Sequence, residues 1–163
     1  MNLNSEHNYK AYFQSLATSH QDVDYFRFGD EKDKHVNQRS GAQAGILLWL
    51  DYYQPIQLAG EQDNFLGVVI ADLTVMQASS DKKDDLAQQQ GKYLACEEII
   101  QQIFARVAYD YQLDVLENTP LWDRARFGRM TDHSYAGTMY LGCTAELPFH
   151  VPLKMEYDPS KWT

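Results

Sequence analysis

Apolar residues gather in two neighbouring stretches of the first half of the chain, Ile46–Tyr53 and Phe65–Met76. The first stretch begins with residues that are apolar on both faces, which is typical of a strand covered on both sides. The turn-rich segment Ala59–Asn64 lies between them, so the pattern predicts a pair of strands. Pro55 donates no hydrogen bond to a ladder, so the first strand ends there, bends there or lies at an edge of the sheet.

A first helix is predicted over Ser5–Ser19 by apolar residues at helical spacing. Asn4 or Ser5 provides its N-cap. Four large side chains recur at i, i+3, i+4 and i+7 and form one face: Tyr9, Tyr12, Phe13 and Leu16. A helix this short is marginal alone, so we expect this face to dock on a core.

A second, longer helix is predicted over Asp84–Tyr111, where an apolar stripe again repeats at helical spacing. Ser80 or Asp81 is expected to cap its N-terminus. Gly91 weakens the middle by about 1 kcal/mol relative to alanine, which makes it a candidate kink.

Shorter extended segments complete the pattern. Asp24–Phe28 reads as a short strand, Gly137–Leu147 alternates between apolar and polar residues, and Phe149–Tyr157 is extended. The segment Leu121–Thr131 has no assignable period. This order of helix, strands, long helix and strands predicts an α+β fold, in which one antiparallel sheet packs the long helix on one face.

Composition limits the partners and the compartment. The 163 residues fit a single α+β domain over residues 1–163. A net charge of −9 repels phosphate, which argues against nucleic acid and anionic membranes as partners. The N-terminal residues lack the apolar run of a signal peptide, so we expect a cytoplasmic protein. Cys96 and Cys143 lie in apolar segments as free thiols, with a disulfide between them as the less favoured alternative.

Catalytic and metal-binding patterns are missing from the sequence. No nucleotide-binding loop or nucleophile motif occurs. Asp51 and Asp72 could pair as general acid and base only if they faced one cleft, and a strand aspartate more often faces solvent. The histidines show no metal-ligand spacing on a shared element: His7, His20, His35, His133 and His150. We therefore expect a protein that is not an enzyme and that binds no cofactor or metal ion.

One basic cluster stands out in this acidic chain. Trp122 is followed by Arg124, Arg126 and Arg129. Arginine beside aromatic residues is typical of interface hot spots, where the guanidinium pairs with carboxylates. These four residues are the predicted interface, and an acidic face of another copy is the expected partner. Two alternatives stay open, namely a solvated segment in which Arg126 closes an internal ion pair and a phosphate-ligand site.

The order of elements resembles that of small tail-completion proteins of tailed phages, specifically the minor tail or tail-terminator family. The elements that carry the resemblance are Ser5–Ser19, Ile46–Tyr53, Phe65–Met76, Asp84–Tyr111 and Gly137–Leu147. Members of that family form closed rings, typically hexamers, that cap the tail tube and offer a surface to the connector. The resemblance implies a homo-oligomer that contacts other tail proteins and is cytoplasmic or assembled into a phage-like particle.

The leading hypothesis is therefore a structural, non-enzymatic ring subunit of the tail-completion type. The alternative is a small-molecule-binding domain or enzyme with a pocket between the sheet and the long helix. Trp49, Tyr52 and Tyr140 would line that pocket, and Asp51 or Asp72 would supply its polarity. A third possibility is a cytosolic adaptor, which the sequence does not separate from the first.

Overall fold

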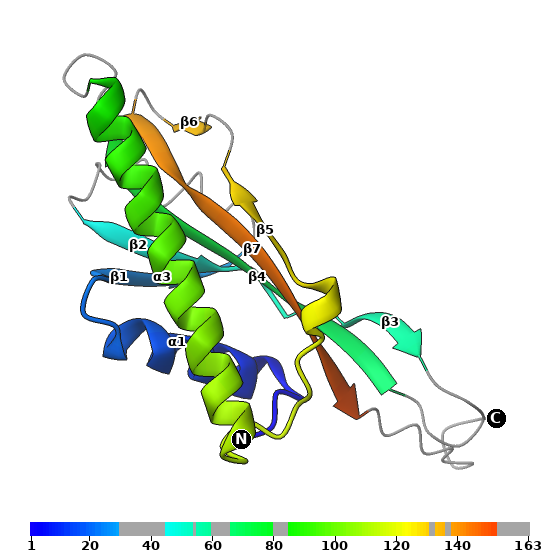
Figure 1. The fold of residues 1–163 in the computed structure, drawn as a ribbon. Coiled ribbons are helices and arrows are strands. Elements are labelled where there is room, and N and C mark those ends of the chain that lie inside the picture. The colour runs from blue at the N-terminus through cyan, green and yellow to red at the C-terminus, as the bar shows by residue number, and fades with distance from the viewer. Residues whose placement is uncertain are drawn as a thin grey trace, which may run out of the picture.

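The described part of the chain forms one mixed sheet with two helices on one of its faces (Figure 1). The computed structural model describes residues 1–29, 45–53, 55–59, 66–79, 85–130, 133–135 and 138–152. The elements are α1 (Glu6–Ser19), β1 (Tyr25–Phe28), β2 (Ile46–Leu50), β3 (Pro55–Ala59), β4 (Leu66–Ser79), α3 (Leu86–Gln112), the 3₁₀-helix η1 (Trp122–Arg124), β5 (Arg126–Arg129), β6 (His133–Tyr135) and β7 (Thr138–Pro152). The sheet order is β1-β2-β4-β7-β5, with β3 on β4 and β6 on β7. The predicted α+β class is confirmed.

The long antiparallel pair β4–β7 forms the centre of the sheet. Its register runs without a break from Leu66↔Pro152 to Ser79↔Met139. The two extended segments predicted around Pro148 are joined in one strand as far as Pro152, and residues 153–157 of the second segment lie outside the described residues. The Pro148 carbonyl accepts a hydrogen bond from Leu121 N at 2.8 Å, on the side of β7 away from β4. The nitrogen of Pro148 points to that same side, so the missing N–H costs the β4–β7 ladder nothing.

The predicted apolar strand pair exists as β2 and β4, which are antiparallel neighbours. The first strand is shorter than predicted, because β2 ends at Leu50 and a separate strand, β3, begins at Pro55. β3 pairs with β4 and has a register shift between Pro55 and Gln57. Figure 1 shows the end of the β4–β7 pair that carries β3 extending beyond both helices. Residues 60–64 of the predicted turn lie outside the described residues.

β1 and β2 run parallel, whereas every other strand pair of the described residues is antiparallel. A purely antiparallel sheet was therefore too simple a prediction. Asp24 fixes the start of the parallel pair, because its carboxylate accepts from Ile46 N at 2.7 Å and its own N–H donates to Ile46 O at 2.9 Å. Gly45 has φ +127°, and a Cβ there would meet the Asp24 carboxylate at 2.5 Å, so this entry into β2 requires glycine.

Both helices begin with a side-chain cap. Ser5 caps α1 as one of the two predicted choices, with its Oγ accepting from Asn8 N at 3.3 Å. The cap predicted for the long helix at position 80 or 81 is wrong, because α3 begins after Asp85. The Asp85 carboxylate accepts from Gln88 N at 2.8 Å, and Gln88 Oε1 accepts from Asp85 N at 3.0 Å. The helix continues through Gly91 to Gln112.

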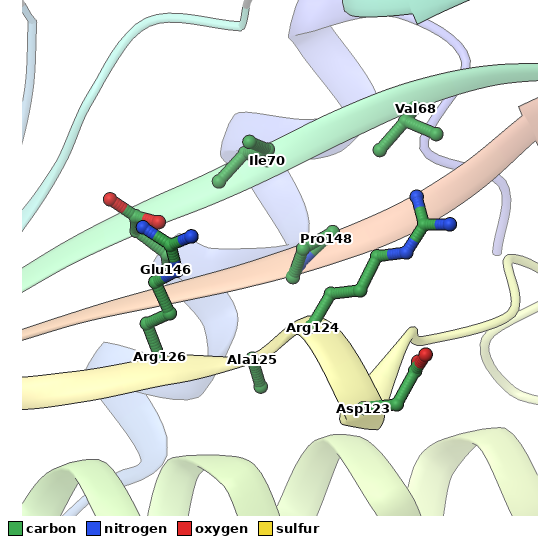
Figure 2. Close-up of a pocket in the computed structure, with 8 residues that line it drawn as sticks. All are labelled: Val68, Ile70, Asp123, Arg124, Ala125, Arg126, Glu146 and Pro148. Atoms are coloured by element: carbon green, nitrogen blue, oxygen red, sulfur yellow. The ribbon is translucent and has the colours of Figure 1, made fainter.

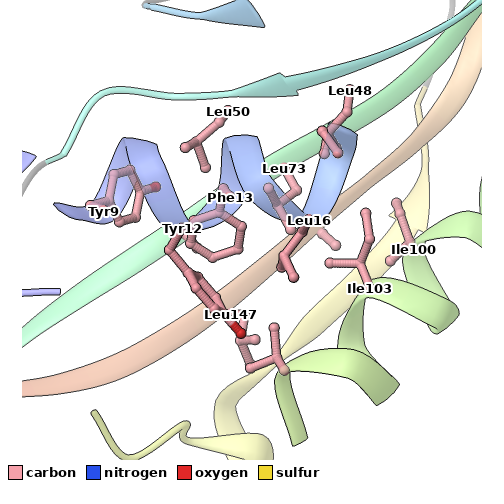
Figure 3. Close-up of a cluster of buried hydrophobic side chains, with 14 of the residues drawn as sticks. Tyr9, Tyr12, Phe13, Leu16, Leu48, Leu50, Leu73, Ile100, Ile103 and Leu147 are labelled. Atoms are coloured by element: carbon pink, nitrogen blue, oxygen red, sulfur yellow. The ribbon is translucent and has the colours of Figure 1, made fainter. Parts of the chain in front are cut away.

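The main core lies between the helices and one face of the sheet (Figure 3). The predicted face of α1 is buried there, against β2, β4 and β7 and against the buried face of α3. The largest apolar members with almost no exposed surface are Leu3, Tyr9, Phe13, Leu48, Leu50, Leu73, Ile100, Ile103, Leu116 and Phe149. None of the described helices is both long enough and apolar enough to cross a membrane.

A buried polar link joins the two helices. Asp110 is 2% exposed, and its carboxylate accepts from the Tyr12 hydroxyl at 3.0 Å and from Arg106 Nε at 2.7 Å. Burial, and then the Asp110 carboxylate, raise the pKa of Tyr12. Since both carboxylate oxygens have partners, this link orients α1 against α3 and has no spare group for chemistry.

Candidate functional site

The segment that carries the predicted interface residues folds as a one-turn helix followed by an edge strand. Its start is fixed by an isolated bridge between Pro120 and Phe149 and by the Leu121–Pro148 hydrogen bond. η1 then turns the chain into β5, which pairs antiparallel with β7. The apolar period is absent here because β5 reads Arg-Phe-Gly-Arg, so long-range pairing with β7 makes it a strand.

Strand alternation divides the predicted cluster between the two faces of the sheet. Arg129 lies opposite Cys143, a member of the helix-side core, and its guanidinium lies 5.2 Å from the ring centroid of Tyr93 on α3. Arg126 lies opposite Glu146, whose neighbours Ala145 and Leu147 point into the core, so Arg126 is on the other face. The four predicted residues therefore form two separate surfaces at one edge.

The first surface, which we call the helix-side strip, consists of Tyr93, Phe104, Trp122, Phe127 and Arg129. The rings of Trp122 and Phe104 meet edge to face at a centroid distance of 6.0 Å. Trp122 and Phe127 are 42% and 44% exposed, which is high for side chains of this size. The strip joins α3 to the edge of the sheet and leaves aromatic surface in contact with solvent.

The outer edge of β5, which lies beside the strip, has backbone groups that pair with no described strand. β5 is the last strand in the sheet order, and no strand of the described residues pairs with its outer edge. An edge strand presents N–H and C=O groups that a strand of another chain can pair with. The helix-side strip and the β5 edge thus combine backbone hydrogen-bonding groups with aromatic anchors.

The second surface is a pocket of about 510 Å³ on the face of the sheet opposite the helices. Figure 2 shows Arg124 and Arg126 extending from the η1–β5 segment over β7, with α1 behind the sheet. Apolar side chains from two strands form its walls: Val68 and Ile70 of β4 and Pro148 of β7. Ala125, after η1, also lines the pocket, while its side chain packs against the helix-side core. Two acidic residues, Asp123 and Glu146, complete the lining.

The charged side chains of the pocket are not tied to one another. Arg124, Arg126, Asp123 and Glu146 form no side-chain hydrogen bond or ion pair within the part of the chain that the structure describes. The internal ion pair considered for Arg126 is therefore not formed with any described residue. Two guanidinium groups remain available above apolar walls.

The aromatic residues of the alternative hypothesis do not meet between the sheet and α3. Trp49 and Tyr140 pack together with Met76 and Met130 on the opposite face, where Trp49 Nε1 donates to Asp51 Oδ1 at 2.9 Å. Tyr52 lies elsewhere, with its ring 5.1 Å from that of Phe28. The space between α3 and the sheet is filled by the main core.

The predicted acid–base pair is joined through backbone, since Asp51 N donates to Asp72 O at 3.0 Å. Asp72 alternates with the core residues Ala71 and Leu73, so its side chain belongs to the face opposite the helices. The Trp49 indole already occupies one oxygen of Asp51. This arrangement orders the end of β2.

The cysteines are free and buried. Burial, and then the neighbouring Cys143, raise the pKa of Cys96 to about 12, and burial also raises the pKa of Cys143. Neither thiol is therefore a ready nucleophile at neutral pH. Within the described residues, no three His, Cys, Asp or Glu side chains gather closely enough to hold a metal ion. His35 lies outside those residues.

Sequence reasoning missed most of both surfaces. Phe127 lies inside the predicted cluster and could have been added from its neighbours alone. The pocket walls could not, because Ile70 and Pro148 are brought together only by the β4–β7 register. Comparison of the chain with protein-family models, curated proteins and solved structures gives no match.

Proposed function

We propose that the protein is a structural, non-enzymatic subunit that assembles with copies of itself through the β5 edge and the helix-side strip. The observation that carries this proposal is an edge strand whose outer side is unpaired among the described residues, flanked by two large exposed aromatic residues, Trp122 and Phe127. Added ladder hydrogen bonds would give affinity, and the aromatic side chains would fix the register.

A local charge pair would favour association between copies, against the repulsion that their net charges produce at long range. The chain carries a net charge of −9, so an approaching copy presents an excess of carboxylates. The Arg129 guanidinium lies over the Tyr93 ring at the surface of the strip, and it has no hydrogen-bond or ion-pair partner among the described residues. Such a pair would help to select the partner surface and would be weakened by salt.

The sheet order favours a ring as the form of the assembly. β1 and β5 are the two end strands of the described sheet. If β5 of one copy meets the β1 edge of the next, the contact is head-to-tail and closes into a ring when the rotation per copy divides a full turn. A closed ring is the assembly that the resemblance to tail-terminator proteins implies, and other tail proteins would then bind the faces of the ring.

Light scattering coupled to size-exclusion chromatography tests the proposal. We expect the wild-type protein to elute as one closed oligomer of more than two copies. The double variant Trp122→Ser, Phe127→Ser should elute as a monomer, because both anchors are lost while their exposure keeps the fold intact. Leu86→Ser is the matched control, since Leu86 is 80% exposed at the other end of α3.

Three results would count against the proposal. A wild-type protein that stays monomeric at high concentration removes self-association. An oligomer that survives the double variant places the interface elsewhere on the chain. A symmetric dimer through β5 keeps the edge but rejects the ring, because a contact between two β5 strands is self-complementary and closes after two copies.

A further inference from the structure

The pocket opposite the helices is built by residues far apart in the sequence. Val68 and Ile70 project from β4 and Pro148 from β7, and the segment from Asp123 to Arg126 lines the other side (Figure 2). Val68 is 4% exposed, and Pro148 lies opposite Ile70 in the ladder, so this wall is part of the rigid β4–β7 pair. A volume of about 510 Å³ is within the range of sites that hold small organic molecules.

The polar groups of the pocket favour an anion with a single charge. Arg124 and Arg126 have no side-chain partner among the described residues, and each guanidinium offers a planar set of donors that fits a carboxylate. Asp123 and Glu146 line the same pocket, so its formal charge sums to zero. A phosphate dianion would meet these two carboxylates, whereas one carboxylate can pair with the arginines at a smaller electrostatic cost.

We propose that this pocket binds a small organic carboxylate with an apolar body. The guanidinium groups of Arg124 and Arg126 extend on either side of Pro148 (Figure 2), so both side chains turn toward the carboxylate to donate hydrogen bonds to it, and the apolar body lies against Ile70 and Pro148. This site is distinct from the helix-side strip because the two lie on opposite faces of the sheet. Ligand binding and self-association can therefore be measured separately.

A pair of probes that differ only in charge tests the site. 1-Naphthylacetate carries the acid and 1-naphthylacetamide replaces it with a neutral amide. A ligand of this size at a half-open site binds with a dissociation constant of about 1 mM, so a chemical-shift titration of the ¹⁵N-labelled protein is the suitable measurement. We expect the acid to shift the amide signals of β4, β5 and β7 around the pocket and to bind at least about fivefold more tightly than the amide.

Arginine variants locate the binding. Arg124→Gln and Arg126→Gln should each weaken binding of the acid about fivefold, because each removes a charge-assisted hydrogen bond at an exposed site. Arg129→Gln is the matched control, since it removes the same charge three residues away but on the other face. Its affinity for the acid should equal that of the wild type.

Several results would overturn the proposal. Equal affinity for acid and amide shows an apolar site without anion recognition. Equal losses in all three arginine variants show a general charge effect, and inorganic phosphate that competes as strongly as the acid shows a phosphate site. Absence of binding, together with an oligomer that dissociates in Arg124→Gln, assigns the pocket to contact between copies.

Discussion

The two faces of the β4–β7 pair have different coverings. On the helix side, 23 buried residues of the described chain form one cluster that includes both helices, whereas the opposite face holds a cluster of four. The same strands therefore serve two purposes according to residue parity. Odd-numbered positions such as Leu73 pack under the helices, whereas even-numbered positions lie on the opposite face, where Val68 and Met76 are buried and Ile70 is partly exposed.

The largest expected effect is on the free energy of unfolding, and it compares two alanine variants of β4, one on each face of the sheet. Leu73→Ala should lower the free energy of unfolding by about 3 kcal/mol, because Leu73 is fully buried under the helices. Ile70→Ala should cost about 1 kcal/mol, since its side chain is only partly buried in the pocket wall. Urea unfolding monitored by circular dichroism measures both. Equal losses would mean that the pocket face is packed as tightly as the core.

Alkaline pH probes the helix-side face through groups that hold their protons there. Burial, the largest cause in each case, raises the pKa of Tyr9 and Tyr12 above their ordinary value of 10.0 and that of Cys96 to about 12 from 9.0. The unfolded chain loses these protons first, so unfolding releases protons and the free energy of unfolding falls as pH rises.

The loss should begin near pH 9 with the thiol and steepen above pH 10 with the phenols. Each group contributes about 1.4 kcal/mol per pH unit beyond its unfolded pKa. Tyr12→Phe should reduce the steepness between pH 10 and 11 by that amount, measured by urea unfolding at each pH. A free energy of unfolding that stays constant from pH 9 to 11 would show that these groups are not protected by the core.

The parts of the fold that follow from periodicity could be predicted from sequence. In three elements, the buried face can be read from the apolar pattern of that segment alone. These elements are α1, α3 and β7. β5 could not be predicted, because Arg126-Phe127-Gly128-Arg129 has neither period and becomes a strand by pairing with β7. The parallel β1–β2 pair likewise depends on Asp24 and Gly45, a contact that no local pattern contains.

The candidate site was predictable in composition and not in geometry. Arginines beside Trp122 are visible in an acidic sequence, and the structure places them at one edge of the sheet. Which arginine faces which surface depends on the register of β5 against β7, and the pocket walls depend on the register of β4 against β7. Both registers are set by contacts between residues far apart in the chain. The prediction from sequence therefore placed in one interface residues that the fold separates onto two faces.

The smallest expected effect is the difference in the free energy of unfolding between two arginine variants, one on each face of the sheet. Arg129→Gln should lower the free energy of unfolding by about 0.5–1 kcal/mol, because it removes a cation that lies 5.2 Å from the Tyr93 ring centroid. Arg124→Gln should change it by less than about 0.3 kcal/mol, since the Arg124 side chain is exposed and has no partner among the described residues. Thermal unfolding of the two variants and of Tyr93→Leu measures the difference. In the Tyr93→Leu background the effect of Arg129→Gln should disappear, because the ring is the partner that gives the cation its contribution. If Arg124→Gln proved as costly as Arg129→Gln, the guanidinium above the pocket would be part of the folded scaffold, and the division of this edge into a stabilising side and a binding side would fail.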